Sequence, residues 1–95
     1  MGVVIEIPSA LRQYVNNQEE VEVQGNSVEE AFESLCKDFV ELKPNLFNEE
    51  GKVRNFINVY LNDDDIRYAD GINSSVKDGD SIQIVPSVAG GSVYS

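Results

Sequence analysis

The sequence predicts an α+β roll in which one long helix covers one face of a mixed sheet. An apolar stripe at helical spacing lies in the middle of the chain, and strand-like alternation lies on both sides of it. The length of 95 residues suits one domain that buries roughly 60 to 65% of its unfolded surface. We therefore expect one domain over residues 1–86 and a flexible C-terminal tail over residues 87–95.

The first two strands are predicted to form a hairpin. Val3 and Ile5 alternate with other residues up to Pro8, which marks the end of the first strand. After a loop, Val21 and Val23 alternate with glutamates, and the Gly25-Asn26 pair ends the second strand.

The helix is expected to begin after Ser27, which with Glu30 forms a capping box. Apolar residues then repeat every three or four positions and form one stripe, which consists of Val28, Ala31, Phe32, Leu35, Phe39 and Leu42. Pro44 is predicted to end the helix at about Leu42 or Lys43.

Two further strands are expected in the second half of the chain. The segment 56–61 places Ile57, Val59 and Leu61 on one face, which is typical of a central strand. An irregular loop follows over residues 68–75, and Asp78-Gly79 forms a turn before the last strand, 81–85, with Ile82 and Ile84 inward. The expected core consists of sheet residues packed against the helix, namely Ile5, Val23, Val59, Leu61, Ile82 and Ile84 against Val28, Phe32, Leu35 and Phe39. The predicted order is β-β-α-β-β.

The acidic run Asn62-Asp63-Asp64-Asp65 is predicted to be a solvated turn and not a calcium loop. Arg67 stands where a further oxygen ligand belongs, and no glutamate follows at the twelfth position. We therefore expect no metal site.

The charge balance narrows the class of partner. Seven basic and seventeen acidic residues give a formal charge of −10, which repels nucleic acid and anionic lipid. The acidity suits either a basic groove on a protein partner or simple solubility. With one cysteine, no basic leader and no long apolar segment, we expect a cytoplasmic protein that does not enter a membrane.

The residues expected of an enzyme's active site are missing from the sequence. There is no histidine, no Gly-rich phosphate loop, and the carboxylates are spread along solvent faces. Cys36 lies at the margin of the helix stripe, without a neighbour that would activate its thiol. We expect a protein without catalytic residues of its own and with no bound cofactor.

The C-terminal segment is the chemically suggestive part of the chain. After Val85-Pro86 and Val88 the chain thins to Ala89-Gly90-Gly91, followed by the overhang Ser92-Val93-Tyr94-Ser95. Consecutive glycines can lie in a channel too narrow for side chains, so residues 88–91 suit a tail that threads into a partner's active site. The alternative is a frayed chain end.

The apolar residues Val85, Pro86 and Val88 form the predicted partner-binding surface beside the tail. The alternative for Val85 is that this residue simply finishes the core strand.

These features together resemble the ubiquitin-like sulfur carriers of the MoaD/ThiS type, which share the β-grasp fold. The resemblance rests on the element order, on Leu61-Asn62 before a turn, on Asp78-Gly79-Asp80-x-Ile82-x-Ile84, and on Pro86-x-Val88-Ala89-Gly90-Gly91. The Ile-Pro-x-x-Leu-Arg opening from Ile7 to Arg12 is similar to carriers that serve cysteine biosynthesis. The overhang after Gly91 departs from the family, most of whose members end at the second glycine.

The resemblance implies that an ATP-using, E1-like enzyme adenylates the Gly91 carboxylate, which is then converted to a thiocarboxylate. It also implies that a JAMM-type zinc metalloprotease cuts between Gly91 and Ser92. The sulfur acceptor would be a biosynthetic enzyme, with a cysteine-synthase-like enzyme favoured over thiamin, molybdopterin or other routes. The alternative is a ubiquitin-like modifier conjugated to lysines through Gly91, or a plain protein-binding module.

Overall fold

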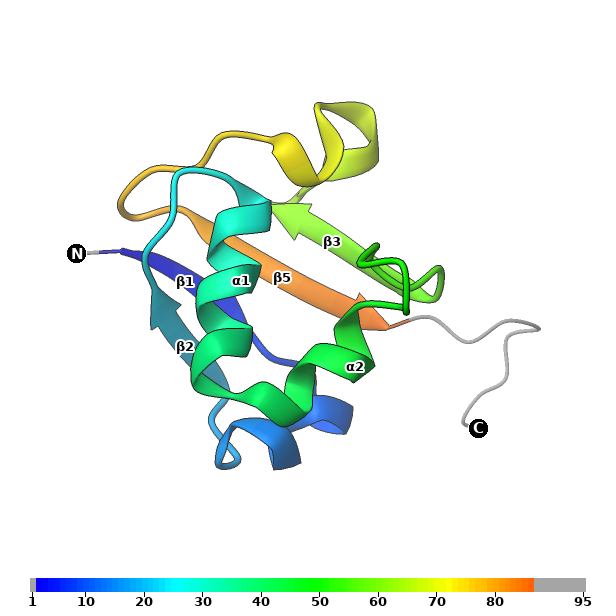
Figure 1. Ribbon diagram of the computed structural model, residues 1–95. Coiled ribbons are helices and arrows are strands. Elements are labelled where there is room, and N and C mark those ends of the chain that lie inside the picture. The colour runs from blue at the N-terminus through cyan, green and yellow to red at the C-terminus, as the bar shows by residue number, and fades with distance from the viewer. Residues whose placement is uncertain (1, 87–95) are drawn as a thin grey trace.

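The computed structural model describes residues 2–86, which form a five-stranded sheet with the main helix across one face (Figure 1). The strands are β1 (Val3–Glu6), β2 (Glu20–Val23), β3 (Ile57–Leu61), β4 (Asp64–Asp65) and β5 (Ser81–Pro86). Their order in the sheet is β2-β1-β5-β3-β4, with β1 and β5 parallel and the other neighbours antiparallel. The predicted mixed sheet and β-grasp roll are confirmed.

The main helix, α1 (Val28–Asp38), begins where the sequence predicts. The Ser27 hydroxyl accepts a hydrogen bond from the backbone N–H of Glu30 at 3.2 Å. The Glu30 carboxylate in turn accepts from the backbone N–H of Asn26 at 2.9 Å, one residue before the cap. Two amides at the start of the helix are therefore satisfied by side chains.

The prediction of one long helix that continues to Leu42 or Lys43 is wrong. α1 ends at Asp38 because Phe39 adopts a non-helical conformation (φ −128°, ψ 77°), and the chain continues through the 3-10 helix η2 (Val40–Leu42) into α2 (Lys43–Leu46). Pro44 lies in the first turn of α2, where its missing N–H breaks no helical hydrogen bond. Leu42 is still fully buried, so the change of direction keeps the apolar stripe on the core.

Three segments expected to be loops or turns are more ordered than predicted, and one of them supplies β4, a strand that the predicted β-β-α-β-β order lacks. The loop after β1 is the 3-10 helix η1 (Ser9–Val15), which buries Leu11 and Val15. Asn62 and Asp63 both have positive φ, as a tight two-residue hairpin requires, and this turn allows β4 to pair with the end of β3. The predicted loop 68–75 contains the end of η3 (Ile66–Tyr68) and all of η4 (Gly71–Asn73).

The core lies between α1 and the sheet. Phe32 is fully buried, and its ring meets that of Phe47 edge to face at a centroid distance of 6.1 Å. Of the residues expected in the core, eight are buried, and Phe39 and Leu61 are partly buried against them; the eight are Ile5, Val23, Val28, Phe32, Leu35, Val59, Ile82 and Ile84. None of the described helices has the length and apolar character needed to cross a membrane.

Candidate functional site

The candidate site begins at β5, the central strand that carries the chain toward its C-terminus (Figure 1). β5 pairs with β1 only as far as Gln83, opposite Glu6, whereas it pairs with β3 as far as Pro86, opposite Ile57. The last residues of β5 therefore extend beyond β1 and are held by β3 alone. Proline cannot donate a backbone hydrogen bond, so Pro86 is a suitable last residue for this strand.

The predicted tail residues lie outside the part of the chain that the structure describes. They are Val88, Ala89, Gly90, Gly91 and Ser92. The adenylation site, the threading segment and the cleavage position therefore stay predictions.

Val85 and Pro86, the two predicted partner-binding residues that the structure describes, lie at the end of β5. Successive side chains of a strand point to opposite faces, so Ile82 and Ile84 enter the core while Val85 points to the other, open face of the sheet. Val85 is 41% exposed, and Pro86 is half-buried. An exposed valine at the point where the chain leaves the domain is available for contact with a partner.

Glu6 lies near the middle of the open face and is held by two side chains from β5. The Ser81 hydroxyl donates to Glu6 Oε2 at 3.1 Å, and the Gln83 amide donates to Glu6 Oε1 at 3.2 Å. Ser81, Gln83 and Val85 are alternate residues of β5 and share the open face with Glu6 of β1. Alternation along β5 predicts that Ser81, Gln83 and Val85 share one face, but their contact with Glu6 depends on the pairing of β1 with β5 and has no signal in the sequence.

A hollow of ≈ 220 Å³ borders the end of β5 and is lined in part by Val85 and Gln83. Three carboxylates, those of Glu6, Glu19 and Glu20, line it together with one basic residue, Arg12. The Arg12 Nε donates to the Ile7 carbonyl at 3.0 Å, which fixes the guanidinium at the edge of the fold. The surroundings of the tail exit are therefore acidic, which suits a basic surface on a partner.

Cys36 is buried, and its surroundings do not favour a reactive thiol. Burial raises the pKa of Cys36 to about 11, partly offset by the positive charge of Lys43. The thiolate is the nucleophilic form of cysteine, so this side chain acts at neutral pH as a small apolar residue.

The acidic turn does not gather into a metal site. The Arg67 guanidinium hydrogen-bonds to Asp65, with its Nη2 2.7 Å from Oδ2, and lowers the pKa of that carboxyl. Among residues 2–86, no group of three or more Asp, Glu, Cys or His side chains could hold a metal ion.

Comparison with known proteins identifies the family. The ThiS family matches residues 5–91. The sulfur carrier protein CysO of Mycobacterium tuberculosis (strain H37Rv) is 33% identical over 93 residues, and the alignment covers 96% of this chain and all of that relative.

Solved structures show the same relationship. A chain of the Amycolatopsis orientalis BexX/CysO complex has a TM-score of 0.86 and 40% identity, with coverage of 95% of this chain and 100% of that one. The small archaeal modifier protein SAMP1 of Methanosarcina acetivorans has a TM-score of 0.81 and 28% identity, with coverage of 94% and 95%. Because the ThiS match spans nearly the whole chain and a relative aligned over that length is a sulfur carrier protein, this chain belongs to the ThiS family of ubiquitin-like sulfur carriers.

Proposed function

We propose that this chain is the precursor of a sulfur carrier that works through Gly91. Removal of Ser92–Ser95 would expose the Gly91 carboxylate, which is then adenylated and converted to a thiocarboxylate that donates sulfur in biosynthesis. One observation carries the proposal: the family match ends on Gly91, whereas the chain continues to Ser95. Cysteine is the favoured product because of the CysO relatives, with thiamin, molybdopterin and other sulfur metabolites as alternatives.

The chemistry explains why trimming must come first. A carboxylate oxygen can attack the α-phosphorus of ATP and release pyrophosphate, which leaves an acyl adenylate. A sulfur nucleophile then displaces AMP from that carbonyl. In the precursor the Gly91 carbonyl belongs to an amide bond with Ser92, whose oxygen is a far weaker nucleophile. Hydrolysis of that bond by a JAMM-type zinc metalloprotease would supply the carboxylate.

The proposed partners act in turn on the tail. The metalloprotease first cleaves the overhang, an E1-like activating enzyme then supplies the ATP chemistry, and a cysteine-synthase-like enzyme accepts the sulfur, all in the cytosol. The existence of a complex between a CysO relative and BexX supports stable docking of the folded domain. We assign the docking surface to Val85 and Pro86 at the end of β5, where Val85 is exposed next to the Glu6 cluster, and to Val88, which follows them in the sequence.

A second function, conjugation to proteins through Gly91, is favoured by the likeness to SAMP1. Both functions need the same activated Gly91 carboxylate and differ in the final acceptor. A carrier gives up sulfur and is regenerated, whereas a modifier stays attached to a lysine of its target.

The intact mass of the protein purified from its native cells distinguishes these functions. We expect a chain that ends at Gly91 with one carboxylate oxygen replaced by sulfur. A branched peptide in which Gly91 is joined to a lysine would favour the modifier. A population that consists only of the chain ending at Ser95 would contradict both, and would leave a plain protein-binding module.

A further inference from the structure

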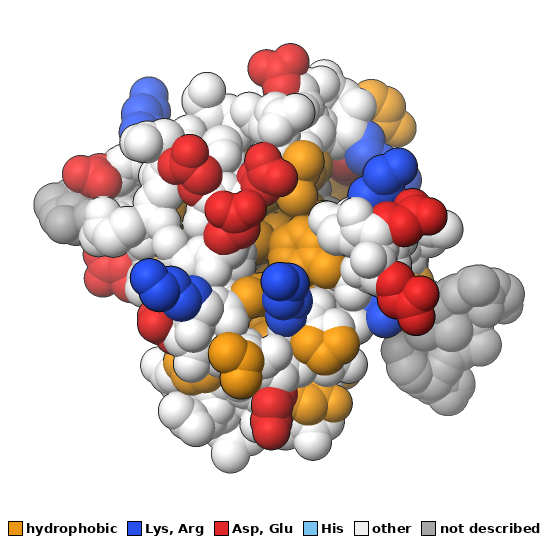
Figure 2. Space-filling view, viewed as in Figure 1, with side chains coloured by type: hydrophobic (Ala, Val, Ile, Leu, Met, Phe, Trp, Pro, Cys, Tyr) orange, Lys and Arg blue, Asp and Glu red, His pale blue; other side chains and the backbone are white. Residues whose placement is uncertain are grey.

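A second surface lies on the α1 side of the sheet, away from the open face. Two hollows of ≈ 450 and ≈ 540 Å³ adjoin each other, since both are lined by Glu29 and Gly51, and we call the pair the α1 groove. One half lies between the loop 51–55, β3 and η4, and the other lies between α1 and α2. Figure 2 shows apolar side chains gathered in a hollow on this face, with both basic and acidic side chains around them.

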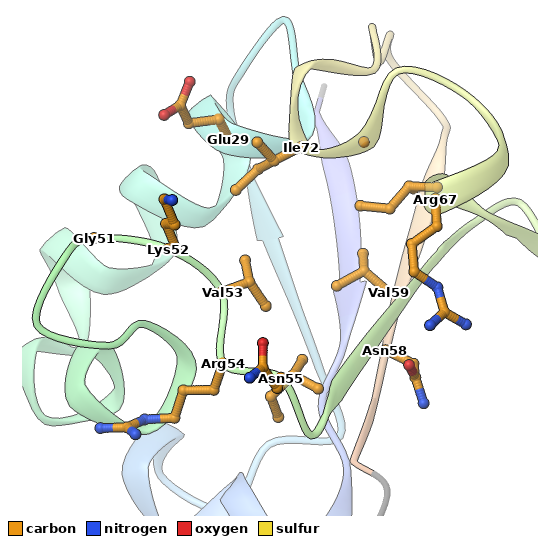
Figure 3. A pocket seen from close by; sticks show the side chains of 13 residues that line it. Glu29, Gly51, Lys52, Val53, Arg54, Asn55, Asn58, Val59, Arg67 and Ile72 are labelled. Atoms are coloured by element: carbon orange, nitrogen blue, oxygen red, sulfur yellow. The ribbon is translucent and has the colours of Figure 1, made fainter.

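The lining of the α1 groove is largely apolar. Val53, Val59 and Ile72 point into one half (Figure 3), and Phe47 and Val40 line the other. Val40 is 70% exposed, an unusual exposure for a large apolar residue. Val59 and Phe47 are buried, whereas Val53 and Ile72 are only partly buried. With Val40 they leave apolar surface accessible in this hollow, which is typical of a protein-binding site.

Basic residues concentrate around this groove. It is lined by five of the seven basic residues of the chain, and by only two of the seventeen acidic ones, Glu29 and Glu33. The five are Lys37, Lys43, Lys52, Arg54 and Arg67. The groove therefore has the opposite charge balance to the chain as a whole.

Not all of these charges are engaged within the fold. Arg67 is paired with Asp65, and the Arg54 Nε donates to the Pro44 carbonyl at 2.8 Å. In contrast, Lys37, Lys43 and Lys52 form no ion pair with any of residues 2–86. Three ammonium groups beside an apolar groove are free to meet carboxylates of a partner.

The groove also runs along an open strand edge. β4 pairs only with Tyr60 and Leu61, so within the described chain no strand covers the outer edge of β3 at residues 57–59, where only the Ile57 N–H is engaged, with the Arg54 carbonyl at 3.0 Å. The same residues line the groove. An extended peptide can pair with such an edge and place alternate side chains in the adjoining pocket.

We propose that the α1 groove binds an extended segment of a protein partner in which apolar anchors alternate with Asp or Glu. The apolar side chains would enter the hollow over Val53 and Val59, and the carboxylates would meet the free lysines. Because the groove lies on the α1 side and Val85 on the opposite face, a partner could hold the carrier here while the tail is in use. The proposal does not depend on the chemistry at Gly91.

The test uses the full-length chain and a synthetic peptide of alternating valine and aspartate. About eight residues would span roughly 26 Å when extended, which is enough to follow the groove. We expect amide chemical-shift changes in an NMR titration at residues 51–59 and in α1, with none at Gln83 or Val85. Lys52→Glu should weaken binding about tenfold. Lys77→Glu, the same charge change outside the groove, should leave binding nearly unchanged.

Several results would overturn the proposal. These are the absence of shift changes at millimolar peptide, shift changes centred on the open face, and equal weakening by Lys52→Glu and Lys77→Glu. If the free protein shows concentration-dependent shifts at residues 51–59, the groove binds a second copy instead. If the chemical shifts of residues 51–59 in the free protein differ between a chain ending at Pro86 and the chain ending at Ser95, the α1 groove binds the protein's own tail instead. Equal binding of a peptide in which each aspartate is replaced by lysine would contradict the proposed pairing of carboxylates with the lysines of the groove.

Discussion

The two faces of β5 contact different surroundings although their residues alternate along one strand. Ile82 and Ile84 are 0% and 3% exposed and pack under α1, whereas Val85, the next residue, is 41% exposed on the open face. On that open face Ser81 and Gln83 hold the Glu6 carboxylate. Substitutions one residue apart should therefore separate the stability of the fold from recognition of the tail.

The same comparison explains how the tail can be presented without weakening the domain. β5 is hydrogen-bonded between β1 and β3, so the residues before the tail belong to the centre of the sheet. The chain then leaves from a strand end that only β3 accompanies. A rigid base close to the proposed reactive end limits the loss of entropy when a partner takes up the tail.

The largest effect is expected on the core face of β5. Ile84→Asp places a carboxylate at a position that is 3% exposed, with no basic residue in the apolar core to pair with it. Burial of an unpaired charge should cost about 4 kcal/mol or more, a large part of the stability of a small domain. Circular dichroism and urea denaturation should show a chain that is largely unfolded. A cooperative transition at the parent's midpoint would contradict this assignment of faces.

A somewhat smaller loss is expected from the helix side of the same core. Phe32 is fully buried and meets Phe47 edge to face, so Phe32→Ala should reduce the free energy of unfolding by about 3 to 5 kcal/mol. The measurement is the urea concentration at the midpoint of unfolding, with the slope of unfolding free energy against urea unchanged. A midpoint that barely moves would show that α1 presents a different face to the sheet.

A change at the start of α1 should have a more modest effect. Ser27→Ala removes the hydroxyl that accepts from the Glu30 amide and should cost about 1 kcal/mol. Ser27→Asp, which retains a capping oxygen, is the matched control and should stay near the parent. Equal losses of stability in the two variants would show that Ser27 does not stabilise α1 by capping it.

The smallest change in stability is expected at Val85. Val85→Asp should change the free energy of unfolding by less than about 1 kcal/mol because the side chain is on the open face of the sheet. The same variant should dock more weakly to the activating enzyme, as measured by titration calorimetry. If the variant binds as tightly as the parent, the docking surface lies elsewhere.

Local patterns predicted much of this fold because they act over a few residues. The Ser27 cap and the alternation along β5 specify a helix start and a buried face, and both predictions are confirmed. The predicted end of α1 is wrong because Pro44 does not stop this helix but lies in the first turn of α2. No proline or glycine at Phe39 indicates the break in the sequence. The break depends on how the residues after Phe39 pack onto the core.

The surfaces were harder to predict than the elements because they depend on how distant segments meet. Glu6 and Gln83 are far apart in sequence and come together only through the parallel pairing of β1 with β5. The α1 groove likewise combines lysines from three separate segments. A composition with a formal charge of −10 gave no sign that one face would be rich in free lysines.

The central claim is that Gly91 is the functional end of the chain, and ATP–pyrophosphate exchange tests it most directly. Chains ending at Ser95 and at Gly91 would each be incubated with the activating enzyme, ATP and labelled pyrophosphate. We expect exchange only with the chain ending at Gly91, because only that form has a free carboxylate there. Addition of the metalloprotease should rescue the longer chain, and Gly91→Val should block both trimming and exchange. Equal exchange by the uncut chain ending at Ser95 would contradict the account.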